Sequence, residues 1–290
     1  MLPQVIAGGL SAGSIYALVA LALVITYKTT GVPNFAQGEM AMVSAFVAYV
    51  LMTDFQTGFF VAFTVALVFA FILGVGFEAV ILRRVRNPSH LNLLVVTLGF
   101  QLALFGLAGW KWGAEQRQFP FPVSPNEALR IGDVSISTLG VATISISVVL
   151  MVGVFAFFRF TKLGVAMQAT QQDSMAARIN GVPTRRVVGL TFGMSSVIGA
   201  VAALLTAPLI TLDTTLMWDP LLKGFAAAVL GGLNAPVGAV LGGYLLGLIE
   251  NLFGAYVSVE FKSAVAFLII ILVLCFRPSG LFARHYKRKV

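Results

Sequence analysis

The chain is poor in two kinds of residue: those that cover a water-exposed surface and those that build a catalytic centre. Asp, Glu, Lys and Arg make up 10% of its 290 residues, whereas a soluble domain has roughly 25%. The single cysteine, Cys275, excludes an intramolecular disulfide and argues against a metal cluster. The two histidines, His90 and His285, have no His or Cys neighbours at metal-ligand spacing. We therefore expect neither a catalytic site nor a metal site.

Most of the chain consists of long apolar runs. Hydrophobic residues make up 59% of the chain, and runs of the length that crosses a bilayer as a helix, about 20 residues, follow one another from Gln4 to Phe276. The sequence predicts an all-α integral membrane protein with about eight transmembrane segments, in a single transmembrane domain over residues 1–290. The predicted segments are 4–27, 35–52, 58–82, 91–109, 138–160, 187–210, an interrupted stretch at 222–253, and 263–276.

The charged residues lie mainly in the connections, and basic connections alternate with acidic ones. Lys and Arg concentrate at 83–86, at 162–186 and in the tail at 284–289. Because basic loops stay in the cytoplasm, we expect a multi-pass protein of a bacterial inner membrane with its N-terminus outside and its C-terminus in the cytoplasm. Orientation in membrane lipid then explains the net charge of +8, and no nucleic-acid partner is expected. The acidic residues assigned to the outer connections are Asp54, Glu115, Glu127, Asp133, Asp213, Asp219 and Glu260.

The stretch at 222–253 must enter the membrane and return, because the connections on both of its sides are predicted to be outside. Its middle, from Gly231 and Gly232 through Asn234 to Pro236, contains residues that break helices. We expect a hairpin or re-entrant loop of two short helices there. Non-helical backbone inside a membrane needs protein or water to satisfy its polar groups, so such a break is typical of a transport pathway.

A second interruption, at residues 31–39, leads into the segment at 35–52. Both interruptions follow a span rich in glycine and serine, which indicates an internal repeat at about 4–137 and 138–276. With the orientation given above, the two copies run in opposite directions. This arrangement is typical of transporters whose substrate path lies between inverted repeats.

Two acids are the hardest residues to explain as packing: Glu39 in the second segment and Glu250 near the end of the interrupted stretch. A carboxylate at bilayer depth costs roughly a few kcal/mol unless it is paired or hydrated. Both acids either line a hydrated path or have a structural role in holding the broken helices. Gln101 is expected to make a hydrogen bond between helices. The predicted translocation-path residues are Asn34, Gln37, Gly38, Glu39, Gly231, Gly232, Asn234 and Glu250.

The basic connection at 161–186 contains helix signals of its own. Asp173 suits the position before a first helical residue, two alanines follow it, and Gly181 and Pro183 end the helix. A helix of about two turns is marginal in water, so we expect it to dock onto something. A cytosolic partner protein is the leading interpretation, and lipid headgroups are the alternative.

The segment Met175-Ala176-Ala177-Arg178-Ile179-Asn180-Gly181 resembles the loop that permease subunits of binding-protein-dependent ABC importers present to their ATPases, usually written Glu-Ala-Ala, three residues, Gly. Met175 occupies the position of the Glu, so a carboxylate is missing from the expected coupling surface. Further stretches are similar, in order along the chain, to permeases of the branched-chain amino acid importer family. They are residues 34–39, 161–164, 231–243 and 277–282.

The resemblance implies several partners. They are a second permease subunit in a heterodimer, two cytoplasmic ATP-binding subunits and a periplasmic or extracellular solute-binding protein. The chain has no Gly-x-x-x-x-Gly-Lys-Ser/Thr phosphate loop, so it is expected to bind no cofactor, and ATP is used by the partner subunits. The residues that the resemblance assigns to ATPase coupling are Asp173, Met175, Ala176, Ala177, Arg178 and Gly181.

The predicted function is therefore that of a non-enzymatic permease subunit, which forms part of a translocation path for branched-chain or related small amino acids. The alternative is a self-contained secondary transporter or channel for a small polar solute, driven by an ion gradient through Glu39 and Glu250. The two differ in whether the purified chain transports without ATP.

Overall fold

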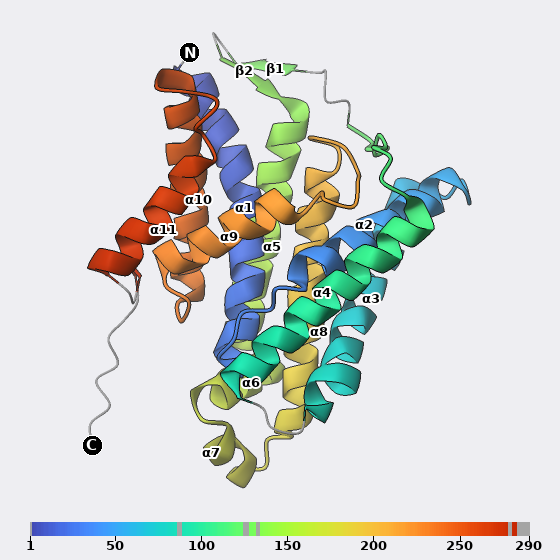
Figure 1. Cartoon of the computed structure of the whole chain (residues 1–290), viewed down its shortest axis with the longest axis vertical. Helices are drawn as coiled ribbons and strands as arrows, with labels where there is room; N and C mark the ends of the chain where they lie inside the picture. The colour runs from blue at the N-terminus through green and yellow to red at the C-terminus, as the bar shows by residue number, and fades with distance from the viewer. Residues whose placement is uncertain (1, 86–88, 124–127, 132–133, 278–279, 283–290) are drawn as a thin grey trace.

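The computed structural model describes residues 2–85, 89–123, 128–131, 134–277 and 280–282. They form a bundle of helices with a short β-hairpin at one end (Figure 1). The first part contains α1 (Leu2–Thr30), α2 (Gln37–Thr53), α3 (Phe59–Gly76), the π-helix η1 (Phe77–Ile81), the 3₁₀-helix η2 (Leu82–Arg84), α4 (His90–Trp112), β1 (Ala128–Ile131) and β2 (Val134–Ser137). The second part contains α5 (Thr138–Phe160), α6 (Lys162–Gln172), α7 (Ser174–Ile179), α8 (Thr184–Thr206), α9 (Trp218–Gly231), α10 (Pro236–Tyr256) and α11 (Ala264–Phe276).

Within the described residues, six helices are long and apolar enough to cross a membrane: α1, α3 with its continuation to Arg84, α4, α5, α8 and α10. The helices α2, α9 and α11 are shorter, with 17, 14 and 13 residues. The prediction of an all-α membrane protein with interrupted helices is confirmed, and α5 has the predicted bounds. The hairpin, in which Ala128 pairs with Ser137, was not predicted.

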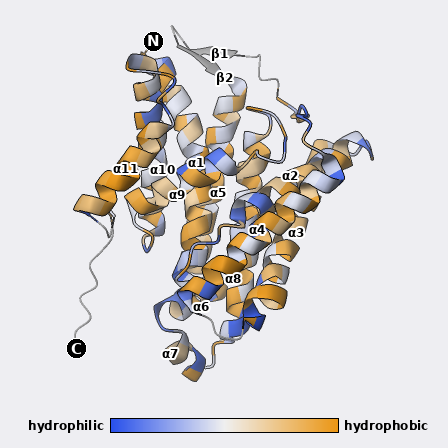
Figure 2. Cartoon of the chain, in the orientation of Figure 1, coloured by the Kyte–Doolittle hydropathy of each residue, from blue (hydrophilic) through white to orange (hydrophobic). Residues whose placement is uncertain are grey.

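The connections group at two ends of the bundle. At the basic end, Arg83 donates a hydrogen bond to the carbonyl of Arg185 at 3.1 Å, and Gln171 Nε2 lies 3.5 Å from Thr29 Oγ1. At the opposite end, which we name the N-terminal end, the connections after α4 and α8 pair through an antiparallel bridge, Arg117 to Leu212. Figure 2 shows hydrophilic residues gathered around α6 and α7, with apolar residues along the helices above them. The charged residues Arg86, Glu127 and Asp133 and the basic tail at 284–289 lie outside the described residues.

Helix α1 is the centre of the bundle. Every residue from Gly13 to Thr26 is buried, and α1 packs against α5, α8, α9 and α10. The backbones of α1 and α10 approach closely because glycines of the two helices face each other, and a methyl group added to Gly247 would overlap the backbone of Gly13. Such contacts let helices associate in lipid, where apolar side chains gain nothing by leaving it.

Two helices begin inside the bundle. Irregular residues 31–36 lead into α2, and irregular residues 207–217 lead into α9. The predicted break within 222–253 is confirmed: the chain turns at Gly232, with a φ of 105°, and Pro236 begins α10. The prediction of two short helices there is wrong for α10, which has 21 residues. Its glycines do not end the helix because they pack against the backbones of α1 and α9.

The packing of α1–α4 recurs in α8–α11. Helix α1 packs along α9 and α10, and α8 packs along α2 and α3. Helix α2 contacts α3 and α4, and α9 contacts α10 and α11. Because α1 begins at the N-terminal end and α8 begins at the basic end, corresponding helices run in opposite directions (Figure 1).

Residues 161–186 contain the two helices α6 and α7 at the basic end and the first residues of α8 (Figure 1). The short helix α7 lies where the sequence predicts one. The preceding α6 was not predicted, because Gly164 in its first turn is an unfavourable helix residue. In the structure, the hydroxyl of Thr161 accepts from the amide of Gly164 at 3.0 Å, and this glycine fits closely against the backbone of Phe157.

Candidate functional site

Glu39 lies where the two interrupted helices meet. It is in the first turn of α2 and is 1% exposed. Its Oε1 accepts a hydrogen bond at 2.9 Å from Nε1 of Trp218, the first residue of α9. The amide of Gln101 on α4 faces the same carboxylate, and Oε2 has no partner in the part of the chain that the structure describes. One carboxylate therefore joins α2, α4 and α9.

Neighbouring polar residues connect the start of α2 to α1 and α8. Gln37 Nε2 donates to the carbonyl of Ser195 at 2.9 Å, and the Ser195 hydroxyl donates to the carbonyl of Ala22 at 2.8 Å. Asn34 Nδ2 lies 3.5 Å from Gln37 Oε1, and the missing side chain of Gly38 leaves room for α9. The structure thus brings four of the predicted path residues together around the start of α2.

Figure 1 shows the starts of α2 and α9 inside the bundle, between its N-terminal end and its basic end. Since Trp218 is bonded to Glu39, the two helices begin at the same depth. A buried carboxylate oxygen is favourable there only beside a hydrogen-bond donor.

A second polar cluster joins α9 to α10. Lys223 Nζ lies 2.6 Å from Glu250 Oε1 and 2.7 Å from Asp219 Oδ2. The side chains of Lys223 and Glu250 are 8% and 1% exposed, whereas that of Asp219 is 62% exposed. Tyr16 of α1 completes the cluster, with its ring 5.5 Å from the Lys223 ammonium and its hydroxyl facing Glu250. The predicted residue Glu250 is thus half of an ion pair inside the protein.

Lys223 was not among the predicted site residues. Its signal in the sequence is its spacing of four from Asp219, which places both on one face of a helix. It is also the one basic residue between 187 and 253. Its partner Glu250 is 27 residues further along on another helix, so their contact depends on the turn between α9 and α10.

The predicted path residues Gly231, Gly232 and Asn234 lie apart from the junction of α2 and α9. They belong to the turn between α9 and α10, where Gly231 meets the backbone of Gly238. Residues 281–282 cover this turn through backbone hydrogen bonds to the end of α9. A place for these three residues on the translocation path stays a prediction.

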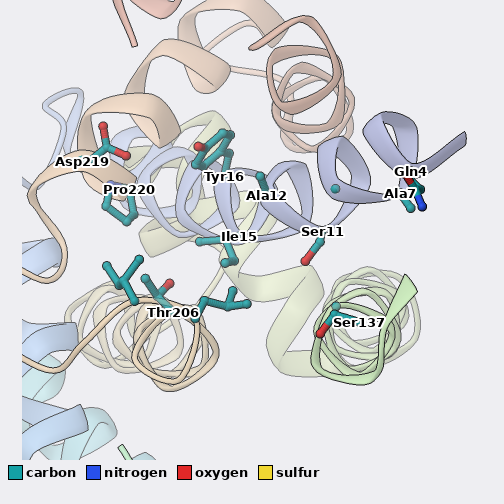
Figure 3. Close-up of a pocket in the computed structure, with 14 residues that line it drawn as sticks. Gln4, Ala7, Ser11, Ala12, Ile15, Tyr16, Ser137, Thr206, Asp219 and Pro220 are labelled. Atoms are coloured by element: carbon teal, nitrogen blue, oxygen red, sulfur yellow. The ribbon is translucent and has the colours of Figure 1, made fainter. Parts of the chain in front are cut away.

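Two cavities of about 410 Å³ each lie beside the polar clusters. The first, which we name the N-terminal cavity, lies between α1, α5, α8 and α9 (Figure 3). Asp219 and Pro220 stand at one side of it and Gln4 at the other (Figure 3). The second, the α4–α9 cavity, is lined by Gln101 and Trp218 together with Leu and Phe side chains. Mostly apolar walls with a few polar groups are typical of small-molecule sites.

Helix α7 presents apolar side chains at the basic end. Asp173 Oδ1 accepts hydrogen bonds from the amides of Met175 and Ala176 at 2.9 Å and 3.0 Å and so begins the helix. Ala177 is buried. Met175 and Ile179 are 71% and 79% exposed, and their spacing of four places them on one face. The helix is therefore held on one side and offers an apolar pair on the other.

The remaining predicted coupling residues complete this segment. Arg178 is exposed beside the apolar pair. Gly181 has a φ of 80°, which lets the chain leave the end of the helix. All six predicted coupling residues thus lie in one short segment, and all of them except Ala177 are exposed.

Comparison with known proteins gives one family over nearly the whole chain. The model of the family described as "Branched-chain amino acid transport system / permease component" matches residues 5–274. The chain is 31% identical to the high-affinity branched-chain amino acid transport system permease protein LivH of Escherichia coli (strain K12), over 97% of this chain and 96% of that one. It is 29% identical to the corresponding permease protein BraD of Pseudomonas aeruginosa, over 99% of this chain and 97% of that one.

A solved structure has a similar fold. PsaBC from Streptococcus pneumoniae, in complex with Fab, matches with a TM-score of 0.51 over 94% of this chain and 91% of that one. The two sequences are 14% identical, so this similarity concerns the fold alone.

Proposed function

Because the chain belongs to the family of permease components of branched-chain amino acid transport systems, we propose that it is one permease subunit of an ABC importer. In this role it forms part of the translocation path for branched-chain or related small amino acids. Separate cytoplasmic subunits hydrolyse the ATP, and a solute-binding protein delivers the substrate from outside.

The exposed apolar pair on α7 is the observation that carries the proposal. Met175 and Ile179 stand in water at the basic end on a helix of 6 residues, which is too short to be stable alone. An ATPase subunit that covers Met175 and Ile179 buries their apolar side chains, and Arg178 beside them can form an ion pair with that subunit. The Met in place of the usual Glu thus makes the central coupling contact apolar.

The translocation path is proposed to pass the junction of α2 and α9. Supporting this, polar side chains at membrane depth, broken helices and two cavities occur together there. Trp218 and Asp219 are exposed at the start of α9. A second permease subunit that covers the side formed by α4, α9 and α11 keeps these groups away from lipid.

The basic end is proposed to face the cytoplasm, with the N-terminus on the outside. The recurrent packing of α1–α4 and α8–α11 supports an inverted repeat joined by α5–α7. We propose that the second copy begins at α8, whereas the sequence predicts a start at residue 138. A path between two such copies can open to either side by rocking of one against the other.

The coupling assignment is tested by truncating the apolar pair. In cells that also express the partner subunits, Met175→Ala/Ile179→Ala is expected to reduce co-purification of the ATPase and ATP-dependent uptake at least tenfold. The matched control is Leu163→Ala/Val165→Ala, which truncates two exposed apolar side chains of the neighbouring α6. The control variant should retain both ATPase co-purification and ATP-dependent uptake.

Full ATPase binding and uptake by the α7 variant would show that the coupling contact lies elsewhere. The self-contained carrier makes the opposite prediction in a second assay. It requires uptake by the purified chain alone, in liposomes with an ion gradient and without ATP. We expect no uptake in that assay.

A further inference from the structure

The cluster on α9 and α10 has one more carboxylate than it has cations. Asp219 and Glu250 both pair with the single ammonium group of Lys223, and Tyr16 is an uncharged phenol. Within the described ranges, no other Lys or Arg pairs with either carboxylate. One negative charge of the cluster is therefore uncompensated.

Burial decides which carboxylate carries the uncompensated charge. Glu250 is enclosed by protein and requires its cation permanently, because an unpaired charge in such a place is strongly unfavourable. Asp219 lies on the exposed side of the same ammonium, where an ion pair contributes little. Lys223 thus neutralises Glu250, and the carboxylate of Asp219 remains available to a second cation.

Asp219 is the one charged side chain among the described residues that line the N-terminal cavity. Figure 3 shows it on the same side of the space as Tyr16, with Thr206 of α8 across from them. The other lining groups are apolar side chains, hydroxyls and one amide. A cavity of about 410 Å³ with apolar walls and one anionic group suits a small aliphatic molecule that carries an ammonium group.

The first turn of α9 borders three cavities. Asp219 lines the N-terminal cavity and, with Lys223, a smaller cavity of about 160 Å³ between α9 and α11. Trp218, the residue before it, lines both this smaller cavity and the α4–α9 cavity. A cation bound at Asp219 is therefore next to the cavities on both sides of α9.

We propose that Asp219 binds the ammonium group of the amino acid on its way through the permease, and that the Lys223–Glu250 pair positions this carboxylate. The aliphatic part of the substrate packs on the apolar walls of the N-terminal cavity. This inference rests on the proposed function, because it assumes that amino acids pass along this path.

Three probes of similar size separate the ammonium group from the rest of the substrate. They are L-leucine, 3-methylbutylamine, which keeps the ammonium but has no carboxylate, and 4-methyl-2-oxopentanoate, which keeps the carboxylate but has no ammonium. Binding is measured by saturation-transfer NMR on the purified permease–ATPase complex in nanodiscs, without the solute-binding protein. We expect leucine and the amine to bind and the 2-oxo acid to bind at least tenfold more weakly.

Substitutions assign the effect to one carboxylate. Asp219→Asn is expected to weaken binding of the amine at least tenfold, while Asp219→Glu retains it within about threefold. The matched control is Glu115→Gln, which removes an exposed acid in the connection after α4. Assembly of each variant is checked by gel filtration.

Equal binding of the 2-oxo acid and the amine to the unmodified complex would overturn the inference, whatever the variants do. So would unchanged amine binding by an assembled Asp219→Asn complex. The proposed function is judged separately, by ATP-driven leucine uptake of the unmodified complex with its binding protein. Uptake together with either of those binding results leaves the importer assignment standing and rejects the role of Asp219.

Discussion

Lys223 Nζ lies 2.6 Å from Glu250 Oε1, across the turn that separates α9 from α10. Both side chains are almost completely buried, so the pair connects a helix that begins inside the bundle to one that crosses it. A buried ion pair is weak evidence for stability by itself, because desolvation offsets much of the attraction. Its importance is that loss of either side chain leaves the other as an unpaired buried charge.

Removing one partner of this pair should be far worse than removing both. Glu250→Gln leaves a buried ammonium group and is expected to destabilise the protein by roughly 3–5 kcal/mol, since the exposed Asp219 compensates only in part. Lys223→Met/Glu250→Gln should recover most of that loss. Thermal unfolding of the detergent-purified protein measures both. A double variant as unstable as the summed effects of Glu250→Gln and Lys223→Met, each measured alone, would contradict the pairing.

Glu39→Gln should reduce transport without disturbing helix packing. Glutamine keeps an oxygen that can accept from Trp218 but removes the charge, so assembly should persist while uptake falls about tenfold, or ~1.4 kcal/mol. The companion variant Trp218→Phe keeps the charge and removes the donor. Uptake by reconstituted importers is compared with assembly by gel filtration. Normal uptake by Glu39→Gln would assign this carboxylate a purely structural role.

Gly247→Ala should weaken the contact between α1 and α10. The added methyl group overlaps the backbone of Gly13, and overpacking of this kind costs about 1–3 kcal/mol. Gly99→Ala is the matched control, because a methyl group there enters open space on α4. Thermal unfolding midpoints of the two variants are compared with that of the unmodified protein. The packing described for α1 and α10 is wrong if both variants unfold at the same temperature.

Asp173→Ala should loosen α7 and weaken coupling. The carboxylate accepts two backbone amides at the start of the helix, and loss of such a cap costs about 1 kcal/mol. We expect roughly fivefold weaker ATPase association, measured by titration of the purified ATPase subunit. Asp173→Ser retains a capping oxygen and should stay close to the unmodified value. Equal weakening by both variants would point to a direct ATPase contact of the carboxylate.

Cysteine labelling tests the orientation. In a Cys275→Ser background, a cysteine at Glu115 should react with a membrane-impermeant maleimide added outside intact cells. A cysteine at Lys162 should react only after permeabilisation, because positive loops stay in the cytoplasm. Reaction of the Lys162 position in intact cells would reverse the assigned orientation.

Several features could be read from the sequence because they depend on residues close together in the chain. The apolar runs predict the crossing helices. The predicted bounds of α5 match the structure because the apolar run of this helix stops at Thr161. Asp173 and Gly181 predict both ends of α7, since a cap and a left-handed stop act on the nearest turn of backbone. Gly232 and Pro236 likewise predict the break before α10.

Other features depend on groups that the chain separates widely. Glu39 and Trp218 are 179 residues apart. Sequence patterns that act within one or two helical turns cannot predict a contact between residues so far apart in the chain. Helix α6 and the full length of α10 were missed because glycine has a low helix propensity, while the close backbone packing that offsets it is a tertiary contact.

By itself, the sequence determined the membrane location, the crossing segments, the breaks and the short helix α7, because hydropathy and capping act over one or two turns. Which polar residues meet inside the bundle was decided by helix packing. The close approach of α1 and α10 and the turn after α9 bring Tyr16, Lys223 and Glu250 together and leave Asp219 exposed at a cavity wall. That arrangement of charges exists only in three dimensions, because its members come from three helices.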